Sequence, residues 1–280
     1  MDSCERAEAD VAARVVKHWV AAALVALAGP AFADDWRDEL IPLKPGKFPL
    51  PRPQTGTYRF GWGAVSAAQA EIEFSRQKKA QLQLQLKLTA KTTGPVRALW
   101  QMDAEYTARC DAATLQPIFL QQTERYRKKT ERTRADFTPA EVMRLNEIEP
   151  SSDPPPKPKR FEFSNVKDLQ AALLLVRSQP LLAGDRYSMV VYPARTAYLA
   201  RIDVVGREPV EVGGQRYPAV KLQLALQHIT KKFELEPHEK FKNAYVWLSD
   251  DKDRLLLKIK AEVYVGSVWM ELQSVKFTGE

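Results

Sequence analysis

The stretch Leu82–Thr89, LQLQLKLT, alternates leucine with a polar residue along its whole length. Successive side chains of a β-strand point to opposite faces, so this stretch would form a strand with one leucine face and one polar face. Such a strand is typical of an antiparallel sheet that is covered on one face and meets solvent on the other. We therefore expect Leu84 and Leu86 to be buried, and Gln83 and Gln85 to point outward.

The same alternation recurs on both sides of this stretch. It is found at residues 70–75 and 100–109 and, in the second half of the chain, at 198–205, 219–229 and 255–265. Many short strands separated by glycine- and aspartate-containing turns favour one large sheet that curls or closes. The predicted fold class is therefore mainly β, a large antiparallel curved sheet or open barrel with one central helix.

The central helix is predicted near residues 166–177. Asn165 stands where an N-cap is expected, and Pro180 ends the pattern because proline cannot continue a helix. A Pro-rich loop at residues 150–158 comes before it and interrupts the strands. The apolar residues that recur at helical spacing are Val166, Leu169, Leu173 and Val176.

Residues 1–33 have the features of a secretory signal peptide. A short apolar run at residues 19–28 follows basic residues, and small residues two positions apart precede the junction between Ala33 and Asp34. The run is too short to span a bilayer, which needs about 20 apolar residues. We expect cleavage at this junction and export to the periplasm or cell envelope.

The exported part would have two regions. Residues 34–56 contain five prolines and form a Pro-rich N-terminal arm, and residues 57–280 form a single β-rich domain. Cys4 is removed with the signal peptide and leaves Cys110 alone, so we expect neither an intrachain disulfide nor a disulfide-linked partner. Cys110 itself is interpreted as a small buried residue.

The full chain carries a net charge of +7 at pH 7. In an exported protein this charge either keeps the surface soluble or favours contact with an anionic membrane surface. Nucleic acid is not expected as a partner, because the chain is exported and carries no nucleic-acid-binding motif.

Four segments carry a resemblance to a known family. They are Tyr58–Val65 (YRFGWGAV), Asp168–Gly184 (DLQAALLLVRSQPLLAG), Val246–Arg254 (VWLSDDKDR) and Gly266–Leu272 (GSVWMEL). In these segments the chain resembles the DUF3108 family of exported bacterial proteins of unknown function. The resemblance implies an envelope location and a mainly β fold. It implies no reaction and supplies no catalytic residues.

The residues that usually carry catalysis are scarce. Only His228 and His238 remain after processing, and the chain lacks the motifs of serine hydrolases, zinc proteases and nucleotide-binding proteins. The acidic turn Asp250–Asp253 lacks the glycine and the distal glutamate of a calcium loop. We therefore expect no catalytic residue, no metal and no cofactor, and a hydrolase is the least favoured class.

The leucine faces suggest a binding function instead. A strongly curved sheet with an apolar inner face can hold a lipid or another apolar or amphipathic envelope molecule. The candidate lining residues are Leu84, Leu86, Leu222, Leu224, Leu257 and Ile259. The alternative is that these residues fill a solid core, in which case the protein would be a structural or protein-interaction component of the envelope.

A basic run is the second candidate site. Arg125, Arg127, Lys128 and Lys129 surround Tyr126 in a predicted hairpin. These residues could contact an anionic membrane surface, or they could form an ordinary solvated turn.

Overall fold

The computed structural model describes residues 35–78, 80–151, 155–237, 243–263 and 266–278. The chain divides into two compact units, Met1–Glu39 and Leu40–Glu280. The predicted signal peptide and its cleavage site lie outside the described residues, as does His238. None of the described helices is long and apolar enough to cross a membrane.

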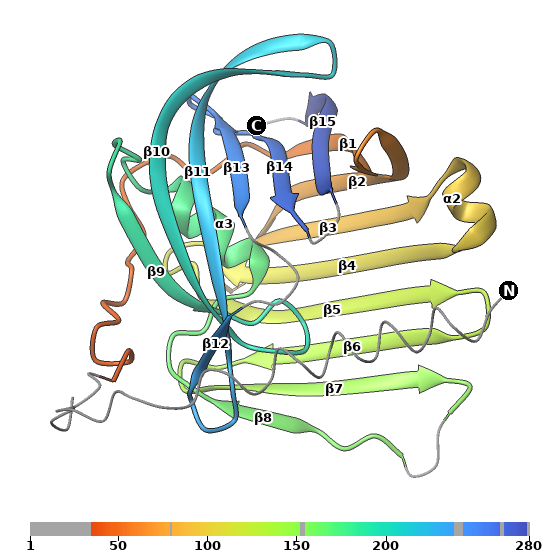
Figure 1. Ribbon diagram of the computed structural model, residues 1–280. Coiled ribbons are helices and arrows are strands. Elements are labelled where there is room, and N and C mark those ends of the chain that lie inside the picture. The colour runs from red at the N-terminus through yellow and green to blue at the C-terminus, as the bar shows by residue number, and fades with distance from the viewer. Residues whose placement is uncertain (1–34, 79, 152–154, 238–242, 264–265, 279–280) are drawn as a thin grey trace, which may run out of the picture. The chain divides into compact units, whose positions relative to one another are not determined.

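The second unit is built on one antiparallel sheet, in which fifteen strands lie within the described residues (Figure 1). The strand order is β8-β7-β6-β5-β4-β3-β2-β1-β15-β14-β13-β11-β10-β9, with the short β12 paired to β11. Strands β8 and β9 form the two ends of this order, so the sheet curves without closing. The predicted fold class, a mainly β protein with a large curved antiparallel sheet, is confirmed.

The first eight strands follow one another in sequence and in space. They are β1 (Gln54–Trp62), β2 (Val65–Lys78), β3 (Leu82–Thr92), β4 (Met102–Asp111), β5 (Pro117–Tyr126), β6 (Thr130–Phe137), β7 (Glu141–Glu149) and β8 (Lys159–Glu162). The remaining strands are β9 (Arg186–Val191), β10 (Tyr198–Val212), β11 (Gln215–Ile229), β12 (Leu235–Pro237), β13 (Ala244–Ser249), β14 (Leu256–Glu262) and β15 (Ser267–Phe277). Pairing of β1 with β15 joins the two series.

The predicted central helix is α3 (Leu169–Arg177), which begins three residues later than expected. Asp168 is its N-cap, and its Oδ1 accepts a hydrogen bond of 2.7 Å from the Ala171 amide. Asn165, the expected cap, has a φ of +59° and lies before an extended segment. In that segment the Lys167 amide donates to the Val190 carbonyl, which holds the chain against β9 and delays the helix.

Helix α3 fills the space enclosed by the curved sheet. It supplies Leu174 and Leu175 to a buried core that also contains Leu84 from β3 and Leu222 from β11. Figure 1 shows α3 between the β1–β4 part of the sheet and β9–β11. We call the face of the sheet that carries Leu84 and contacts α3 the inner face, and the opposite one the outer face.

The prediction for β3 is confirmed for Leu84, only in part for Leu86, and not for Gln85. Leu84 is fully buried and Leu86 is half-buried. Gln85 lies on the outer face, yet the expectation that it meets solvent is wrong, since it is only 3% exposed. The cause is a cross-strand neighbour: Arg109 of β4 pairs directly with Gln85 and donates to its Oε1 over 2.8 Å.

The Pro-rich arm is packed against the end of α3 rather than free. The Phe48 amide donates to the Ser178 carbonyl (3.1 Å), and Gln179 Nε2 donates to the Lys44 carbonyl (2.9 Å). Gly46 lies so close that a Cβ there would be 2.1 Å from the Ser178 oxygen. The arm leads directly into β1, which begins at Gln54.

The long β10–β11 hairpin folds back over the end of the sheet. At its tip, Gly213 has a φ of +57° and approaches the Gln273 backbone of β15 so closely that a side chain would not fit. This contact encloses a second buried core that includes Val212, Trp247 and Leu257. The two cores bury the apolar surface on which a domain of this size relies for stability, and the only described cysteine, Cys110, is free.

Candidate functional site

The six predicted lining residues, five leucines and Ile259, are divided between different parts of the interior. Leu84 and Leu222 belong to the core around α3, where Leu224 packs at the margin. Leu257 belongs to the second core, and Ile259 packs against it. Leu86 lines a small cavity.

That cavity lies between α3 and the inner face and measures about 50 Å³. Its apolar wall includes Ile72, Phe74, Leu86, Leu173, Leu174, Leu256 and Val275. Its polar members are Gln54 and Tyr58 of β1 and Gln170 and Arg177 of α3. Because Gln170, Leu173, Leu174 and Arg177 are spaced at i, i+3, i+4 and i+7, they form one face of the helix, and this face points to the sheet.

The polar atoms of this cavity are unusual because several have no partner. Both amide atoms of Gln170, Nε of Arg177 and Oε1 of Gln54 are buried without a hydrogen bond. Leaving a buried polar group unsatisfied costs about 1–3 kcal/mol, so such groups normally bind water or a ligand. We call these three residues the buried polar set.

Burial also sets the charges here. It lowers the pKa of Arg177 to about 10, which still leaves the guanidinium positive at neutral pH. It raises the pKa of Tyr58 to about 12, so this hydroxyl stays protonated. Arg177 donates to the Asp253 carbonyl oxygen, but no ion pair joins it to a carboxylate within the described residues. The cavity therefore contains a buried positive charge without a direct counter-ion.

A second group of ionisable residues lies at the other end of α3. Burial raises the pKa of Asp168 to about 7, and it also raises the pKa of the Tyr106 hydroxyl and of the Cys110 thiol. Burial lowers the pKa of Lys167, which donates to Gln116 Oε1 over 2.6 Å. A thiol kept protonated is a poor nucleophile, so Cys110 is suited to packing, as predicted from sequence.

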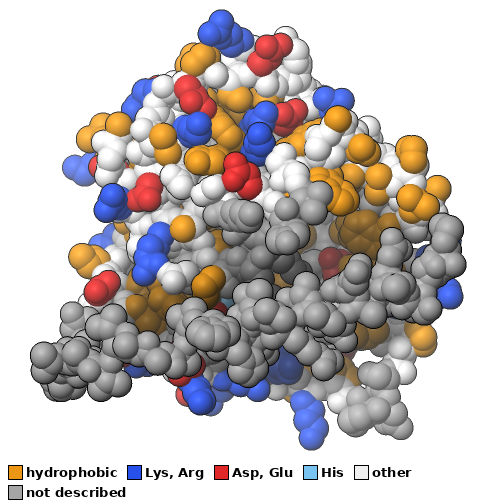
Figure 2. All heavy atoms as spheres, in the orientation of Figure 1, with side chains coloured by type: hydrophobic (Ala, Val, Ile, Leu, Met, Phe, Trp, Pro, Cys, Tyr) orange, Lys and Arg blue, Asp and Glu red, His pale blue; other side chains and the backbone are white. Residues whose placement is uncertain are grey.

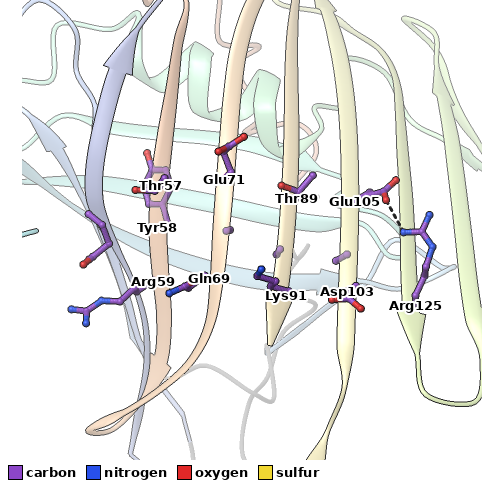
Figure 3. Close-up of a pocket in the computed structure, with 14 residues that line it drawn as sticks. Thr57, Tyr58, Arg59, Gln69, Glu71, Thr89, Lys91, Asp103, Glu105 and Arg125 are labelled. Carbon is purple, nitrogen blue, oxygen red and sulfur yellow. Dashed lines mark hydrogen bonds and ion pairs between the residues drawn. The ribbon is translucent and has the colours of Figure 1, made fainter. Parts of the chain in front are cut away.

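A shallow trough of about 710 Å³ lies on the outer face (Figure 3). Two rows of paired residues border it, Thr57, Glu71, Thr89 and Glu105 in one row and Arg59, Gln69, Lys91 and Asp103 in the next. Four charged groups of the trough and its margin are paired: Arg125 pairs with Glu105 over 2.6 Å, and Arg97 pairs with Asp103 over 2.8 Å. The trough therefore presents charges of both signs at an exposed surface, where ion pairs are weak.

The four basic residues of the predicted surface contact differ in their surroundings. Arg125 belongs to the trough and pairs with Glu105, and Lys129 pairs with Glu131 over 2.5 Å. Arg127 donates to the Ala98 carbonyl, and Lys128 is exposed at the turn. Within the described residues only Arg127 and Lys128 of these four lack an ion pair.

The remaining sequence candidates have structural roles. His228 Nδ1 lies 3.0 Å from Glu236 Oε2 at the β11–β12 pair. In the acidic turn, Asp251 Oδ1 accepts hydrogen bonds from the Asp253 and Arg254 amides, which shapes the turn. Across the described parts of the chain, no group of three or more His, Cys, Asp or Glu side chains is placed to hold a metal.

Sequence reasoning missed Gln170 and Arg177. A signal was present, because two long polar side chains occupy the same stripe of α3 as Leu173 and Leu174. Polar residues on the buried stripe of an amphipathic helix are rare unless they are paired or functional.

A curved, unclosed antiparallel sheet with a helix on its inner face defines the class of this protein. Within that class the chain belongs to DUF3108, a family of proteins of unknown function, whose model matches residues 57–273. A comparison with curated proteins finds no match.

The chain is also similar to solved structures, and the first of those described here shows the same fold. A β-barrel-like DUF1849 protein from Brucella abortus has a TM-score of 0.55 at 9% identity, covering 83% of this chain and 100% of that one. A protein from Bacteroides fragilis that was proposed to be exported and has a YmcC-like fold matches with a TM-score of 0.36 at 7% identity. That match covers 82% of this chain and 99% of the other. A proposed lipoprotein from Parabacteroides distasonis has a TM-score of 0.35 at 9% identity, covering 82% and 98%.

Proposed function

We propose that this protein is an exported, non-catalytic component of the bacterial envelope that binds an amphipathic molecule between α3 and the inner face of the sheet. The head of the ligand would carry a carboxylate or a similar acid. The observation that carries this proposal is the buried polar set, Gln54, Gln170 and Arg177, inside an otherwise apolar wall. Of the predicted lining residues, Leu86 takes part in this site.

The buried polar set has the hydrogen-bonding groups and the charge that an acidic head group would need. An acid would supply the counter-ion that Arg177 lacks and would accept from its free N–H, and charge-assisted hydrogen bonds are the stronger kind. The Gln170 amide offers a donor and an acceptor beside it. A purely apolar ligand would leave these atoms unsatisfied, and for this reason an amphipathic ligand fits better.

The volume of the cavity limits how the ligand can lie. About 50 Å³ accommodates a head group or a few waters, whereas pockets for drug-sized ligands measure about 300–1,000 Å³. An acyl chain would therefore extend along the inner face past the half-buried Ile72 and Leu88, or would require α3 to move outward. Binding would then be coupled to the position of α3.

Export is proposed from the signal peptide features of residues 1–33, and the family resemblance supports an envelope location. The chemistry of the ionisable groups supports a non-catalytic function. The Cys110 thiol is buried and held protonated, and four charged groups of the trough and its margin are neutralised in pairs.

A structural or protein-interaction component of the envelope is the second candidate. It is favoured by the packing of α3, because Leu174, Leu175 and the sheet residues around them fill most of the enclosed space. Under this alternative the cavity would contain only water.

The test combines a ligand search with a binding measurement. Native mass spectrometry of protein purified from its own envelope should show a retained lipid-sized mass. After delipidation, an environment-sensitive fluorescent fatty acid should bind saturably. Leu86→Trp should weaken this binding because the indole would occupy the cavity, while Lys87→Trp, on the outer face of the same strand, should not.

Gln170→Leu separates a ligand site from a structural one. The substitution removes two unsatisfied buried atoms, so the free energy of unfolding should rise, while fatty acid binding should weaken. The ligand site is refuted if all variants bind the probe as the parent does, or if the folded parent binds no probe and retains no lipid. The function as a structural or protein-interaction component of the envelope would then be correct instead.

A further inference from the structure

Three connections meet at one end of the sheet (Figure 1). The β1–β2 turn closes with the Trp62–Val65 pair, and the Thr93 amide donates to the Ala67 carbonyl, which ties the start of α2 (Gly94–Leu99) to β2. The Trp100 ring lies 6.2 Å from the Tyr126 ring at the end of β5. The β1–β2 turn, α2 and the β5–β6 turn therefore form one continuous surface.

This surface exposes large apolar side chains. Leu99 is 88% exposed, Val65 56%, Trp62 55% and Trp100 52%. Figure 2 shows hydrophobic side chains gathered at the right of the view, where Figure 1 places the β1–β2 turn and α2. Helix α2 buries none of its residues, so it does not close a core. A contiguous exposed apolar patch of this kind marks an interaction surface.

The uncompensated basic charges lie beside this patch. The Arg127 guanidinium donates to the Ala98 carbonyl of α2 over 3.0 Å, which places its charge next to Leu99 and Trp100. Lys128 follows it in the turn, and Lys129 lies 5.2 Å from the Tyr126 ring centroid. We call Trp62, Val65, Leu99, Trp100, Arg127 and Lys128 the aromatic–basic end.

We propose that the aromatic–basic end docks on an anionic bilayer surface. Tryptophan prefers the depth of the lipid headgroups, where its ring is in an apolar layer and its N–H stays hydrated. Leu99 and Val65 enter the outer part of the acyl layer, as apolar residues of peripheral proteins do. Arg127 and Lys128 contact the acidic headgroups, and each such charge strengthens binding by about five-fold.

The two basic groups and the arrangement of the apolar side chains favour an anionic lipid surface over a protein partner. A protein-binding patch would bury its apolar centre under a fitted surface. Here the apolar side chains instead project from three separate connections, with the two basic groups beside them. A bilayer requires no fitted shape. This docking is independent of the ligand site under α3, which lies on the inner face.

The test measures co-sedimentation of the mature protein with vesicles of phosphatidylcholine alone or mixed with phosphatidylglycerol. We expect binding to the mixed vesicles that weakens as salt is added, and at least ten-fold weaker binding to phosphatidylcholine. Leu99→Ser with Trp100→Ser should abolish binding. Arg127→Gln with Lys128→Gln should lower it at least ten-fold and flatten its salt dependence.

Matched controls place the same changes elsewhere. Lys231→Gln with Lys232→Gln removes two exposed lysines from the β11–β12 turn, and Leu182→Ser removes a leucine that is 60% exposed. Both controls should bind mixed vesicles as the parent does. Circular dichroism should be unchanged in all variants, because every altered side chain is at the surface.

Insertion depth gives a second readout. Brominated acyl chains should quench tryptophan fluorescence of the bound protein, and Trp100→Phe should remove part of this quenching, whereas Trp247, which is only 7% exposed, contributes none. Equal binding to neutral and anionic vesicles, equal loss in the control variants, or no binding to any vesicle would overturn the proposal. In the last case the patch would be assigned to a protein partner.

Discussion

The guanidinium of Arg254, in the turn between β13 and β14, donates to the backbone carbonyl oxygen of Gln179, 75 residues earlier. The same side chain also donates to the carbonyls of Arg177 and Pro180 and stacks 3.4 Å from the Phe48 ring centroid. The last carbonyls of a helix have no partner within it, so Arg254 acts as a C-terminal cap for α3. In the SDDKDR turn, Arg254 therefore has a structural role.

Replacing Arg254 should therefore loosen α3. Arg254→Met leaves several buried carbonyls unsatisfied, and we expect the free energy of unfolding to fall by about 3–5 kcal/mol. Urea unfolding followed by circular dichroism measures this change. Lys252→Met in the same turn is exposed and should have little effect. Equal losses in the two variants would mean that the turn, and not the cap, holds the helix.

The inner face of β3 can be tested in the same way. Leu84 is fully buried, so Leu84→Ala should lower the free energy of unfolding by about 2–5 kcal/mol. Gln83→Ala should cost well under that amount, since Gln83 is half-buried on the outer face. The loss of unfolding free energy for Gln85→Ala should lie between these two values, because the substitution removes the hydrogen bond from Arg109. A Gln83 loss as large as that of Leu84 would contradict the assignment of faces.

The Asp168 carboxyl predicts a pH dependence. Burial raises its pKa in the folded protein to about 7 from an ordinary value of 3.8, so the folded state binds the proton more tightly. This proton-linked stabilisation is fully present below pH 3.8 and is lost as the pH rises to about 7. At higher pH the folded protein contains a buried charge.

Asp168→Asn removes this dependence and keeps an oxygen that can accept from the Ala171 amide. At about pH 8 the variant should be more stable than the parent by on the order of 2–4 kcal/mol, and at about pH 4 the difference should be small. Asp203→Asn, at an exposed carboxylate paired with Arg186, serves as the control. A variant that is less stable than the parent at both pH values would refute the sign of this effect.

Cys110 offers a direct probe of the core under α3. The thiol is fully buried, and burial raises its pKa, so both access and thiolate formation are suppressed. A thiol-specific reagent should react slowly with the native protein and rapidly in urea. Arg254→Met should accelerate the native reaction if α3 then opens more often. Fast labelling of the native parent protein would show that the core is more accessible than its packing indicates.

The strands could be predicted because their signal is local. In LQLQLKLT the pleat alone sends Leu84 to one face and Gln83 to the other, whatever the strand pairs with. The same holds for the existence of a helix near Leu173 and for the turn at Gly213-Gly214. The first turn of the helix was misplaced because hydrogen bonding of Lys167 to β9 competes with helix formation, and that partner is distant in sequence.

Long-range packing determined the strand pairing, the burial of Gln85 and the cavity, none of which a local sequence pattern contains. The pairing of β1 with β15 joins Gln54 to Phe277, and the burial of Gln85 depends on Arg109 across the strand pair. The cavity exists because Gln170 and Arg177 of α3 meet residues of five strands that come from both ends of the chain. Alternation in the sequence determines which face a side chain takes, whereas its neighbours depend on long-range pairing. Tertiary structure alone therefore placed Arg177, a buried arginine without an ion pair in the described residues, beside Leu86, and Trp100 beside Arg127.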